Sequence, residues 1–544
     1  MQVTQTYHKP SGASSDGQGS KFDFSAECSR KPVSLNALVK DSGAYARVML
    51  ALRKVVVGDW RPKQVDHSAY QAWVAERYLE ELPNHMQGVD AEKLQLMEER
   101  KTVTEEKHKV LGELSALKKG VGTARRKYYE WLYTHDKDKW FVLDPVISVH
   151  QDAVIFEAFS LDESVYGRVS VPSEKLETFD RTVFGTTNID FSQTLADELY
   201  RVRSYRPAWL KVSYEKVEMS TDLGLSLEKK IDLPETWVRG FLQVQSASSL
   251  DGVDFDLDTE TMAETLAVLE RKKEKQGPRS VRFIFKKGKP VTVSIDPWGI
   301  EITDRKIYEG DYEGEIRIWG RRRLSVLKEL LPLSDTISVK MLGTGMPSYW
   351  SVSVEGHRFD VGLSGWTAND WAGKANFDLL ASTGKSNKLK TVLAERVIKE
   401  KMTVTPEGLS ALTGCSRSEA TASLQELCKN GQAMYDHLKG EYRWRQLINQ
   451  EIQVTDPEED ERNTYAISLF KEGKVSYAGK TVEDKHYLTV EGKGTFEPSL
   501  TLDKDGKVKE ASCTCSHYRR NQLRKGPCAH LVASVLYVQN HKKS

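Results

Sequence analysis

Apolar and polar positions alternate through the middle of the chain. Between residues 140 and 366, short runs of β-branched and aromatic residues repeat, which is typical of strands with one buried and one solvated face. The clearest runs are Val281–Phe285, Val291–Ile295, Glu315–Trp319 and Tyr349–Val354. Helical spacing interrupts the strands at Thr261–Lys275 and Arg321–Leu331. Residues 139–383 therefore predict one or two α+β domains with mostly antiparallel sheets.

Helical spacing dominates the part of the chain before these strands. Residues 1–30 are rich in Ser, Gly, Asp and Lys, and we expect a disordered tail there. Apolar residues then recur at helical spacing in Tyr45–Leu52 and Tyr70–Tyr78, so residues 31–138 predict a helical region. A weak heptad follows at Leu96, Val103, Val110 and Leu117. A long coiled-coil dimer would need a more apolar seam, so we favour a helical hairpin packed on the chain's own domain.

Residues 386–446 have the pattern of a separate small domain. Apolar residues mark a first helix at Leu389, Val392, Leu393, Val397 and Ile398. Thr405, followed by proline, predicts the start of a second helix, and Ser416 with Glu419 forms a capping box that opens a third. Two short strands around a Lys-Gly turn then predict a hairpin. Three helices and a two-stranded wing resemble a winged helix.

The most specific chemical pattern lies near the C-terminus. Its Cys-x-Cys…Cys-x-His spacing supplies four candidate metal ligands, Cys513, Cys515, Cys528 and His530. Three thiolates and one imidazole complete a tetrahedral shell for one zinc ion and leave no place for water, as in a structural site. His517 is an alternative fourth ligand. We expect the first pair on an extended segment and the second pair at the start of a helix.

The composition narrows the class of protein. The chain has 544 residues, 39% hydrophobic and 29% charged, and its formal net charge of +1 gives no global attraction to nucleic acid. It contains no apolar run long enough to cross a membrane and no signal-peptide core at its N-terminus. Three of its six cysteines belong to the metal pattern, which fits a reducing compartment. We expect a multidomain cytoplasmic protein without a membrane partner.

Two resemblances to known families extend this picture. Residues 463–540, with strands before the cysteines and an apolar helix after them, resemble the SWIM zinc finger. The segments Ile318–Leu324, Gly362–Trp371 and Asn376–Leu380 resemble a family of bacterial SWIM zinc-finger proteins. Genes of that family tend to lie beside a MoxR-type AAA+ ATPase and a von Willebrand A protein. The resemblance to the bacterial family implies a complex with partners of these kinds. The resemblance to the SWIM zinc finger implies a non-enzymatic module that binds DNA or proteins.

Charge near the zinc pattern favours an anionic partner. From Ala511 to Ser544 the chain carries no Asp or Glu. The loop between the two ligand pairs holds the candidate nucleic-acid contacts Arg519, Arg520, Arg524 and Lys525. In the winged-helix-like segment we add Arg417 and Gln425 on the outer face of the third helix, and Lys439 at the wing tip. The leading hypothesis is therefore a non-enzymatic protein that binds nucleic acid, DNA rather than RNA, through its C-terminal third.

Two other functions compete with this hypothesis. The outer face of the third helix is nearly neutral, which fits an adaptor that docks a protein such as an AAA+ ATPase as well as a DNA reader. An enzyme in the β-rich middle is the third class. The sequence contains no Gly-x-Ser-x-Gly, His-Glu-x-x-His or Walker pattern, so we expect no catalytic residues. The Arg321-Arg322-Arg323 run begins an amphipathic pattern, and we expect these side chains to be solvated or paired within the chain.

Overall fold

The computed structural model describes most of the chain outside residues 61–144. The described residues are 5–6, 12–15, 20–25, 33–60, 127, 145–188, 193–205, 207–213, 229–230, 235–273, 279–365, 370–371, 377–381, 388–447, 461–481, 484–503 and 506–541. The chain divides into two compact units, residues 1–60 with 143–544, and residues 61–142. Apart from Lys127, the second unit lies outside the described residues, and so does the predicted helical hairpin. The following description concerns the first unit.

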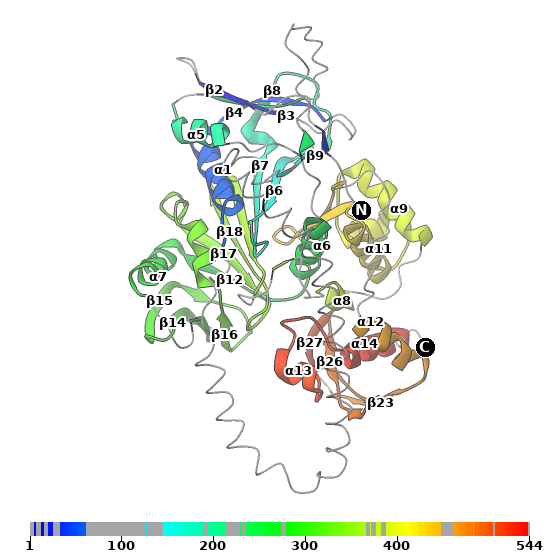
Figure 1. Ribbon diagram of the computed structural model, residues 1–544. Helices are drawn as coiled ribbons and strands as arrows, with labels where there is room; N and C mark the ends of the chain where they lie inside the picture. Colours follow the sequence, from blue (N-terminus) through cyan, green and yellow to red (C-terminus); the bar gives the residue numbers. More distant parts are fainter. Residues whose placement is uncertain are drawn as a thin grey trace. The chain divides into compact units, whose positions relative to one another are not determined.

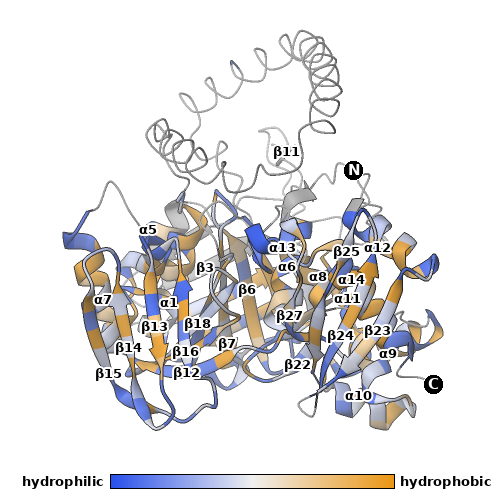
Figure 2. Cartoon of the chain, turned by 90° about the horizontal axis from the view of Figure 1, so that it is seen from below, coloured by the Kyte–Doolittle hydropathy of each residue, from blue (hydrophilic) through white to orange (hydrophobic). Residues whose placement is uncertain are grey.

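An eight-stranded antiparallel sheet organises the β-rich middle (Figure 1). Its strand order is β12-β17-β18-β19-β7-β6-β5-β9. The strands are β5 (Val146–Val149), β6 (Ala153–Phe159), β7 (Val165–Pro172), β9 (Gly185–Asn188), β12 (Val253–Asp258), β17 (Thr336–Met341), β18 (Ser348–Val354) and β19 (His357–Leu363). In Figure 2 hydrophobic residues gather along strands such as β6 and β13. Every residue of β5 and β6 is buried, so this part of the sheet is covered on both faces.

Helix α1 (Ser42–Val56) covers one face of this sheet, against β6, β7 and β19. Its inward residues, which the helical spacing identified, are fully buried: Tyr45, Val48, Met49 and Leu52. The helix approaches β7 closely at Gly167, where an added Cβ would lie 3.0 Å from Leu52 Cδ1. A side chain at this position would push the helix away from the sheet. Helix α6 (Glu235–Ser248) and helix α8 (Phe377–Ala381) pack on each other and contribute Trp237, Phe241 and Phe377 to a second core.

A four-stranded antiparallel sheet of order β15-β14-β13-β16 lies beside β12. Its strands are β13 (Val281–Phe285), β14 (Lys289–Ile295), β15 (Ile300–Tyr308) and β16 (Gly314–Ile318), and helix α7 (Thr259–Arg271) packs against β12 and β15. The predicted helix at Arg321–Leu331 is instead two short 3-10 helices, η3 (Arg321–Leu327) and η4 (Leu331–Leu333). A proline within the second segment supports the break.

The N-terminal segment differs from the predicted disordered tail. Strands β2 (Gly12–Ser15) and β3 (Ser20–Ser25) join a sheet of order β2-β3-β10-β4-β8. Its other strands are β4 (Leu35–Val39), β8 (Leu176–Thr178) and β10 (Ala208–Ser213). The same part of the chain contains η2 (Ser173–Lys175) and α5 (Gln193–Arg201). Strands β1 (Gln5–Thr6) and β11 (Lys229–Lys230) form a separate pair. Strand β10 pairs with β3 in parallel. The backbone of β10 supplies hydrogen-bond partners for β3, and the composition of residues 1–30 alone does not predict this pairing.

The elements predicted within residues 386–446 are present. They are α9 (Lys388–Lys401), β20 (Thr403–Val404), α10 (Pro406–Thr413), α11 (Arg417–Lys429), β21 (Ala433–Asp436) and β22 (Glu441–Trp444). Thr405 caps α10 by accepting a hydrogen bond from the Gly408 amide, and Ser416 with Glu419 forms the predicted capping box on α11. Strand β20 adds a third strand to the hairpin, in the order β20-β22-β21.

The last described segment, residues 461–541, combines a five-stranded sheet with three helices. The elements are α12 (Glu461–Lys471), β23 (Val475–Lys480), β24 (Lys485–Glu491), β25 (Thr495–Phe496), β26 (Ser499–Leu502), β27 (Val508–Ser512), α13 (Ser516–Asn521) and α14 (Ala529–His541). Helix α14 packs against α12 and the strands, and its apolar residues share a core with Leu488 and Leu500. Across the described residues, no helix has the length and apolarity that a membrane crossing requires.

Candidate metal centre and nucleic-acid interface

The four predicted ligands come together where β27 ends and α14 begins. Their ligand atoms all lie within 4.8 Å of one another. A tetrahedral zinc site with Zn–S bonds of about 2.3 Å has edges of about 3.8 Å, so a small inward adjustment gives the required geometry. The side chains are shielded from solvent, with exposed fractions of 6% for Cys513, 3% for Cys515, 2% for Cys528 and 9% for His530. This is the donor set and the burial of a structural zinc site.

Local backbone geometry places the first ligand pair. Strand β27 pairs with β26 up to Ser512, and the chain then continues through Cys513 to Cys515. Cys515 is the N-cap of α13, and its Sγ accepts a hydrogen bond from the Tyr518 amide at 3.4 Å. The Tyr518 hydroxyl donates to the Ala511 carbonyl at 2.6 Å, which ties α13 back to the strand. The two cysteines are thereby held on a short, braced turn.

The second ligand pair lies at the start of α14, as the sequence predicts. The Val532 amide donates to the Cys528 carbonyl at 3.1 Å, which closes the first helical turn. His530 lies within this turn, and its Nδ1 is 4.0 Å from Cys513 Sγ. The Phe496 ring stacks on the imidazole with a centroid distance of 4.1 Å, which fixes the orientation of the ring. His517 does not join the cluster; its Nε2 lies 3.4 Å from Arg462 Nη1.

The close packing of three thiols makes their ionisation interdependent. Hydrogen bonding from Cys528 lowers the pKa of Cys513 to about 4. The reciprocal hydrogen bond to Cys513 raises the pKa of Cys528 well above its ordinary value, and burial raises that of Cys515. One negative charge is therefore easily accommodated, whereas three are not. A dication supplies the charge that holds all three sulfurs as thiolates.

Comparison with protein families identifies this segment. Residues 500–539 match the model of the SWIM zinc finger. The segment is similar to a SWIM zinc finger. Cys513, Cys515, Cys528 and His530 of the finger are positioned to bind one zinc ion, which confirms the predicted cofactor and ligand set.

The other two comparisons add little. The comparison with curated proteins found no match. Among solved structures, the PCNA2–PCNA3 complex from Sulfolobus tokodaii has 12% identity and a TM-score of 0.29, with 44% of this chain and 94% of that chain covered. Proliferating Cellular Nuclear Antigen from Entamoeba histolytica has 11% identity and a TM-score of 0.28, with 41% and 89% covered. Likenesses this weak carry no argument about the fold or the function.

The cations of the finger loop separate into two groups. Arg519 and Arg520 lie on α13, no residue of which is buried, and within the described residues no carboxylate lies at ion-pair distance from either. The Lys525 side chain is also exposed. Arg524 is half-buried, and its guanidinium lies 5.6 Å from the centroid of the Trp319 ring. Arg524 therefore attaches the finger to the β-rich middle, and the remaining three cations are accessible to a partner.

The candidate contacts in residues 388–447 have a different environment. The prediction that Gln425 points outward is wrong, because its side chain is 3% exposed and donates to Ser249 Oγ at 2.8 Å and Tyr442 Oη at 2.7 Å. Arg417 is half-buried and forms an ion pair with Glu407. Lys439 is exposed at the hairpin tip, 3.4 Å from Asp152 Oδ2. The three residues do not form one accessible face.

Buried ion pairs hold the hairpin that lies beside helix α11, and α11 itself packs against α6. The adjacent hairpin contributes Arg445, whose Nη1 lies 2.8 Å from Glu157 Oε1 on β6, and both side chains are fully buried. Asp436 of the hairpin accepts from Arg168 Nη2 at 2.6 Å and from Arg358 Nη2 at 2.8 Å. These long-range pairs join the hairpin to the eight-stranded sheet. Sequence reasoning missed them because nothing local distinguishes a buried arginine from a solvated one.

Two other sequence features receive structural roles. Arg321 donates to the Asp296 carbonyl at 2.5 Å, and Arg323 is 2% exposed with Nη2 2.6 Å from the Gly365 carbonyl. The prediction of pairing within the chain is confirmed for these two arginines. Trp371, from the Gly-Trp segment, is 1% exposed and donates to the Gly362 carbonyl at 3.2 Å. It fills the core.

Proposed function

We propose that this protein is a non-enzymatic cytoplasmic zinc-finger protein that binds nucleic acid, DNA rather than RNA, through the loop between its zinc ligands. The observation that carries the proposal is the exposure of Arg519 and Arg520 on α13, in a segment without acidic residues. The zinc shell carries a formal charge of −1, and the loop cations more than compensate for it. Zinc would hold both ends of the loop, so its side chains lose little conformational entropy when they meet phosphates.

The salt dependence of DNA binding tests this proposal. Each phosphate contact contributes about −0.9 to the slope of log affinity against log salt. Arg519, Arg520 and Lys525 therefore predict a slope of roughly −2.7, since Arg524 is engaged with Trp319. The experiment is fluorescence anisotropy of full-length protein with a labelled DNA duplex over a series of salt concentrations. The double variant Arg519→Ala, Arg520→Ala should flatten the slope by about 1.8 without changing the zinc content.

A matched control separates the loop from general charge. Lys286 and Lys289 are exposed at the β13–β14 turn, and the variant Lys286→Ala, Lys289→Ala removes the same charge from another surface. It should leave the slope unchanged. An absence of binding at low salt, or equal effects of the two double variants, would remove the finger loop from nucleic-acid recognition. A labelled RNA duplex of the same sequence tests the preference for DNA.

The second candidate function is a protein adaptor, and the burial of α11 favours it. Residues 388–447 have the order of elements of a winged helix, which is the fold we propose for them. In winged helices that read DNA, the third helix enters the major groove. Here that helix buries Ala420–Gln425, Leu427 and Cys428, so little of its surface is left for a groove. We therefore assign DNA contact to the finger and an adaptor role to the winged-helix-like unit, with an AAA+ ATPase as the kind of partner that the family resemblance implies.

A further inference from the structure

Helix α9 has two apolar faces, and only one of them faces the core of its own unit. Ala394 and Ile398 are fully buried against α11 and the hairpin. Leu389, Val392 and Leu393 occupy i, i+3 and i+4 positions, and their exposed fractions are 76%, 62% and 48%. The sequence pattern marks all of these residues as helical, but it does not distinguish the inner face from the outer one.

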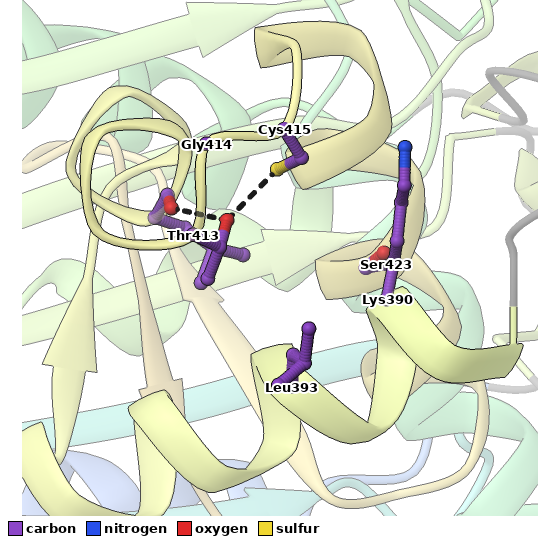
Figure 3. A pocket seen from close by; sticks show the side chains of 7 residues that line it. Lys390, Leu393, Thr413, Gly414, Cys415 and Ser423 are labelled. Carbon is purple, nitrogen blue, oxygen red and sulfur yellow. Dashed lines mark hydrogen bonds between the residues drawn. The ribbon is translucent and has the colours of Figure 1, made fainter.

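The outer apolar face continues across to α10. Leu393 points from α9 into a hollow that is also lined by Leu409 and Thr413 of α10, and Figure 3 shows Lys390 and Ser423 at its other side. Leu412 of α10 is 59% exposed and lies three residues after Leu409. The two helices therefore present four large exposed aliphatic side chains, of which Leu393 lines the hollow. Single exposed leucines are common, but a cluster of this kind marks an interaction surface.

Charge indicates what could cover this surface. Helix α9 carries five basic and two acidic residues: Lys388, Lys390, Arg396, Lys399, Lys401, Glu395 and Glu400. Lys388 and Arg396 are exposed beside the aliphatic cluster. A second copy of this chain would bring two basic surfaces together, which is unfavourable. A nucleic acid would leave the four aliphatic side chains against phosphates and solvent. An acidic and amphipathic partner satisfies both the apolar and the basic features.

We infer that the α9–α10 surface docks an acidic amphipathic helix of a partner protein. Aliphatic side chains at i, i+3 or i+4, and i+7 of that helix would cover Leu389, Val392 and Leu412 and enter the hollow beside Leu393. Glu or Asp residues along its edges would pair with Lys388 and Arg396. This inference rests on the adaptor role proposed above and is independent of nucleic-acid binding by the finger.

Peptide binding tests the inference directly. The probe is a fluorescein-labelled helical peptide of about 18 residues, which spans roughly five turns, with Leu at helical spacing and Glu on both edges. We expect full-length protein to bind it with a Kd near ~10 μM, and the variant Val392→Glu, Leu412→Glu to weaken binding at least tenfold. Both side chains are exposed, so the variant should fold. Leu438→Glu, at a leucine 46% exposed on the hairpin turn, is the matched control and should leave the affinity unchanged.

Additional measurements identify the molecule that binds the α9–α10 surface and the contribution of charge to its binding. A peptide of the same composition, scrambled to lose its apolar stripe, should not bind, and Arg396→Glu should weaken binding of the original peptide about threefold. Equal binding of the scrambled peptide, or equal affinities of the wild type and the Val392→Glu, Leu412→Glu variant, would overturn the inference. A wild-type dimer in sedimentation velocity that this variant dissociates would assign the surface to a second copy. A reduced DNA salt slope in this variant would assign it to nucleic acid. The Arg519→Ala, Arg520→Ala test has a separate readout, so either proposal can fail alone.

Discussion

Residues 388–447 and the finger of residues 461–541 each contain a helix that carries residues predicted to contact nucleic acid. In the first, helix α11 has eight buried residues and its polar Gln425 bonds to Ser249 and Tyr442. In the second, helix α13 has no buried residue. Each helix carries polar residues that were predicted as contacts, yet the surroundings of the two helices differ. Polar composition therefore shows that a helix can face solvent, and only the tertiary partners show whether it does.

The two modules also differ in what holds them in place. Residues 388–447 are fixed by desolvated ion pairs, in which Arg445 meets Glu157 and Asp436 meets two arginines. The finger depends on four side chains that a metal ion would bring together. Its connection to the middle includes Arg524 on Trp319 and Lys507, which donates to the Ser249 carbonyl. One apolar cluster also runs from Phe159 and Tyr349 of the eight-stranded sheet to Leu488 and Val532 of the finger. Helix α13 beside the candidate metal centre is accessible, whereas α11 is covered by its own unit and by α6.

Removal of a zinc ligand should have the largest effect. Cys515→Ser removes one of three thiolates, and structural zinc sites contribute about 10–16 kcal/mol to the folding of small fingers at pH 7. We expect the zinc content to fall from one equivalent per chain to near zero, and residues 500–539 to become sensitive to protease. Elemental analysis and limited proteolysis measure these two changes.

A second cysteine provides the control for this experiment. Cys415 is half-buried in the other module and lies outside the cluster, so Cys415→Ser should keep the full zinc content. Zinc retained in Cys515→Ser would contradict the ligand assignment. Loss of the β-rich middle together with the finger would contradict the contrast between the two modules, because the buried ion pairs of the eight-stranded sheet do not involve the finger.

Breaking the buried ion pair should have the next largest effect. Glu157→Gln leaves Arg445 charged, fully buried and without its carboxylate, and such changes cost about 3–5 kcal/mol. The free energy of unfolding from guanidinium titration measures the loss. The exposed pair Lys328–Glu270 is the control, and Glu270→Gln should cost less than about 0.5 kcal/mol. Equal costs at the two sites would show that the hairpin is not held by desolvated charge.

A half-buried histidine, His437, gives residues 388–447 a pH-dependent stability. Burial, with Arg168 and Arg358, lowers the pKa of His437 to about 4. In the unfolded chain the pKa of histidine is about 6.5. The unfolded state therefore binds more protons than the folded state below pH 6.5. The contribution of neutral His437 to the free energy of unfolding is fully present above pH 6.5 and is lost as the pH falls from 6.5 to 4.

Substitution by phenylalanine isolates this contribution. His437→Phe removes the titrating group and keeps an aromatic ring beside Tyr349, whose centroid lies 5.2 Å away. From pH 7 to pH 5 the free energy of unfolding of the wild type should fall. In the variant this fall should be about 2 kcal/mol smaller. Guanidinium unfolding at the two pH values measures the difference. Parallel pH profiles would show that His437 titrates normally in the folded protein.

Local signals in the sequence predicted much of the fold. Strand β13 has the predicted bounds, Val281–Phe285, because its alternation is strict and its inner residues are all large. The cap at Thr405 and the capping box at Ser416 were also predicted, since these depend on residues within one turn. The zinc ligands belong to the same class, because their spacing alone brings each pair together.

Long-range partners account for what the sequence did not predict. Gln425 was expected to face solvent, and it is buried because Ser249, distant in the sequence, lies against α11. Strand β3 was expected to be disordered, and β10 pairs with it from about two hundred residues away. In both cases the local sequence is compatible with either state. The choice depends on contacts that no single-sequence pattern contains.

The smallest expected effects compare one arginine from each helix. Arg520 is exposed on α13, so Arg520→Ala should reduce the DNA salt slope by about 0.9, the contribution of one phosphate contact. Arg417 on α11 is paired with Glu407, so Arg417→Ala should leave the slope within about 0.2 of the wild-type value. Both variants lose one positive charge from a helix, and neither position touches the zinc ligands. Anisotropy titrations over the same salt series compare them directly. If Arg417→Ala flattened the slope as much as Arg520→Ala, the contrast would fail, because α11 would then contact phosphate despite its burial.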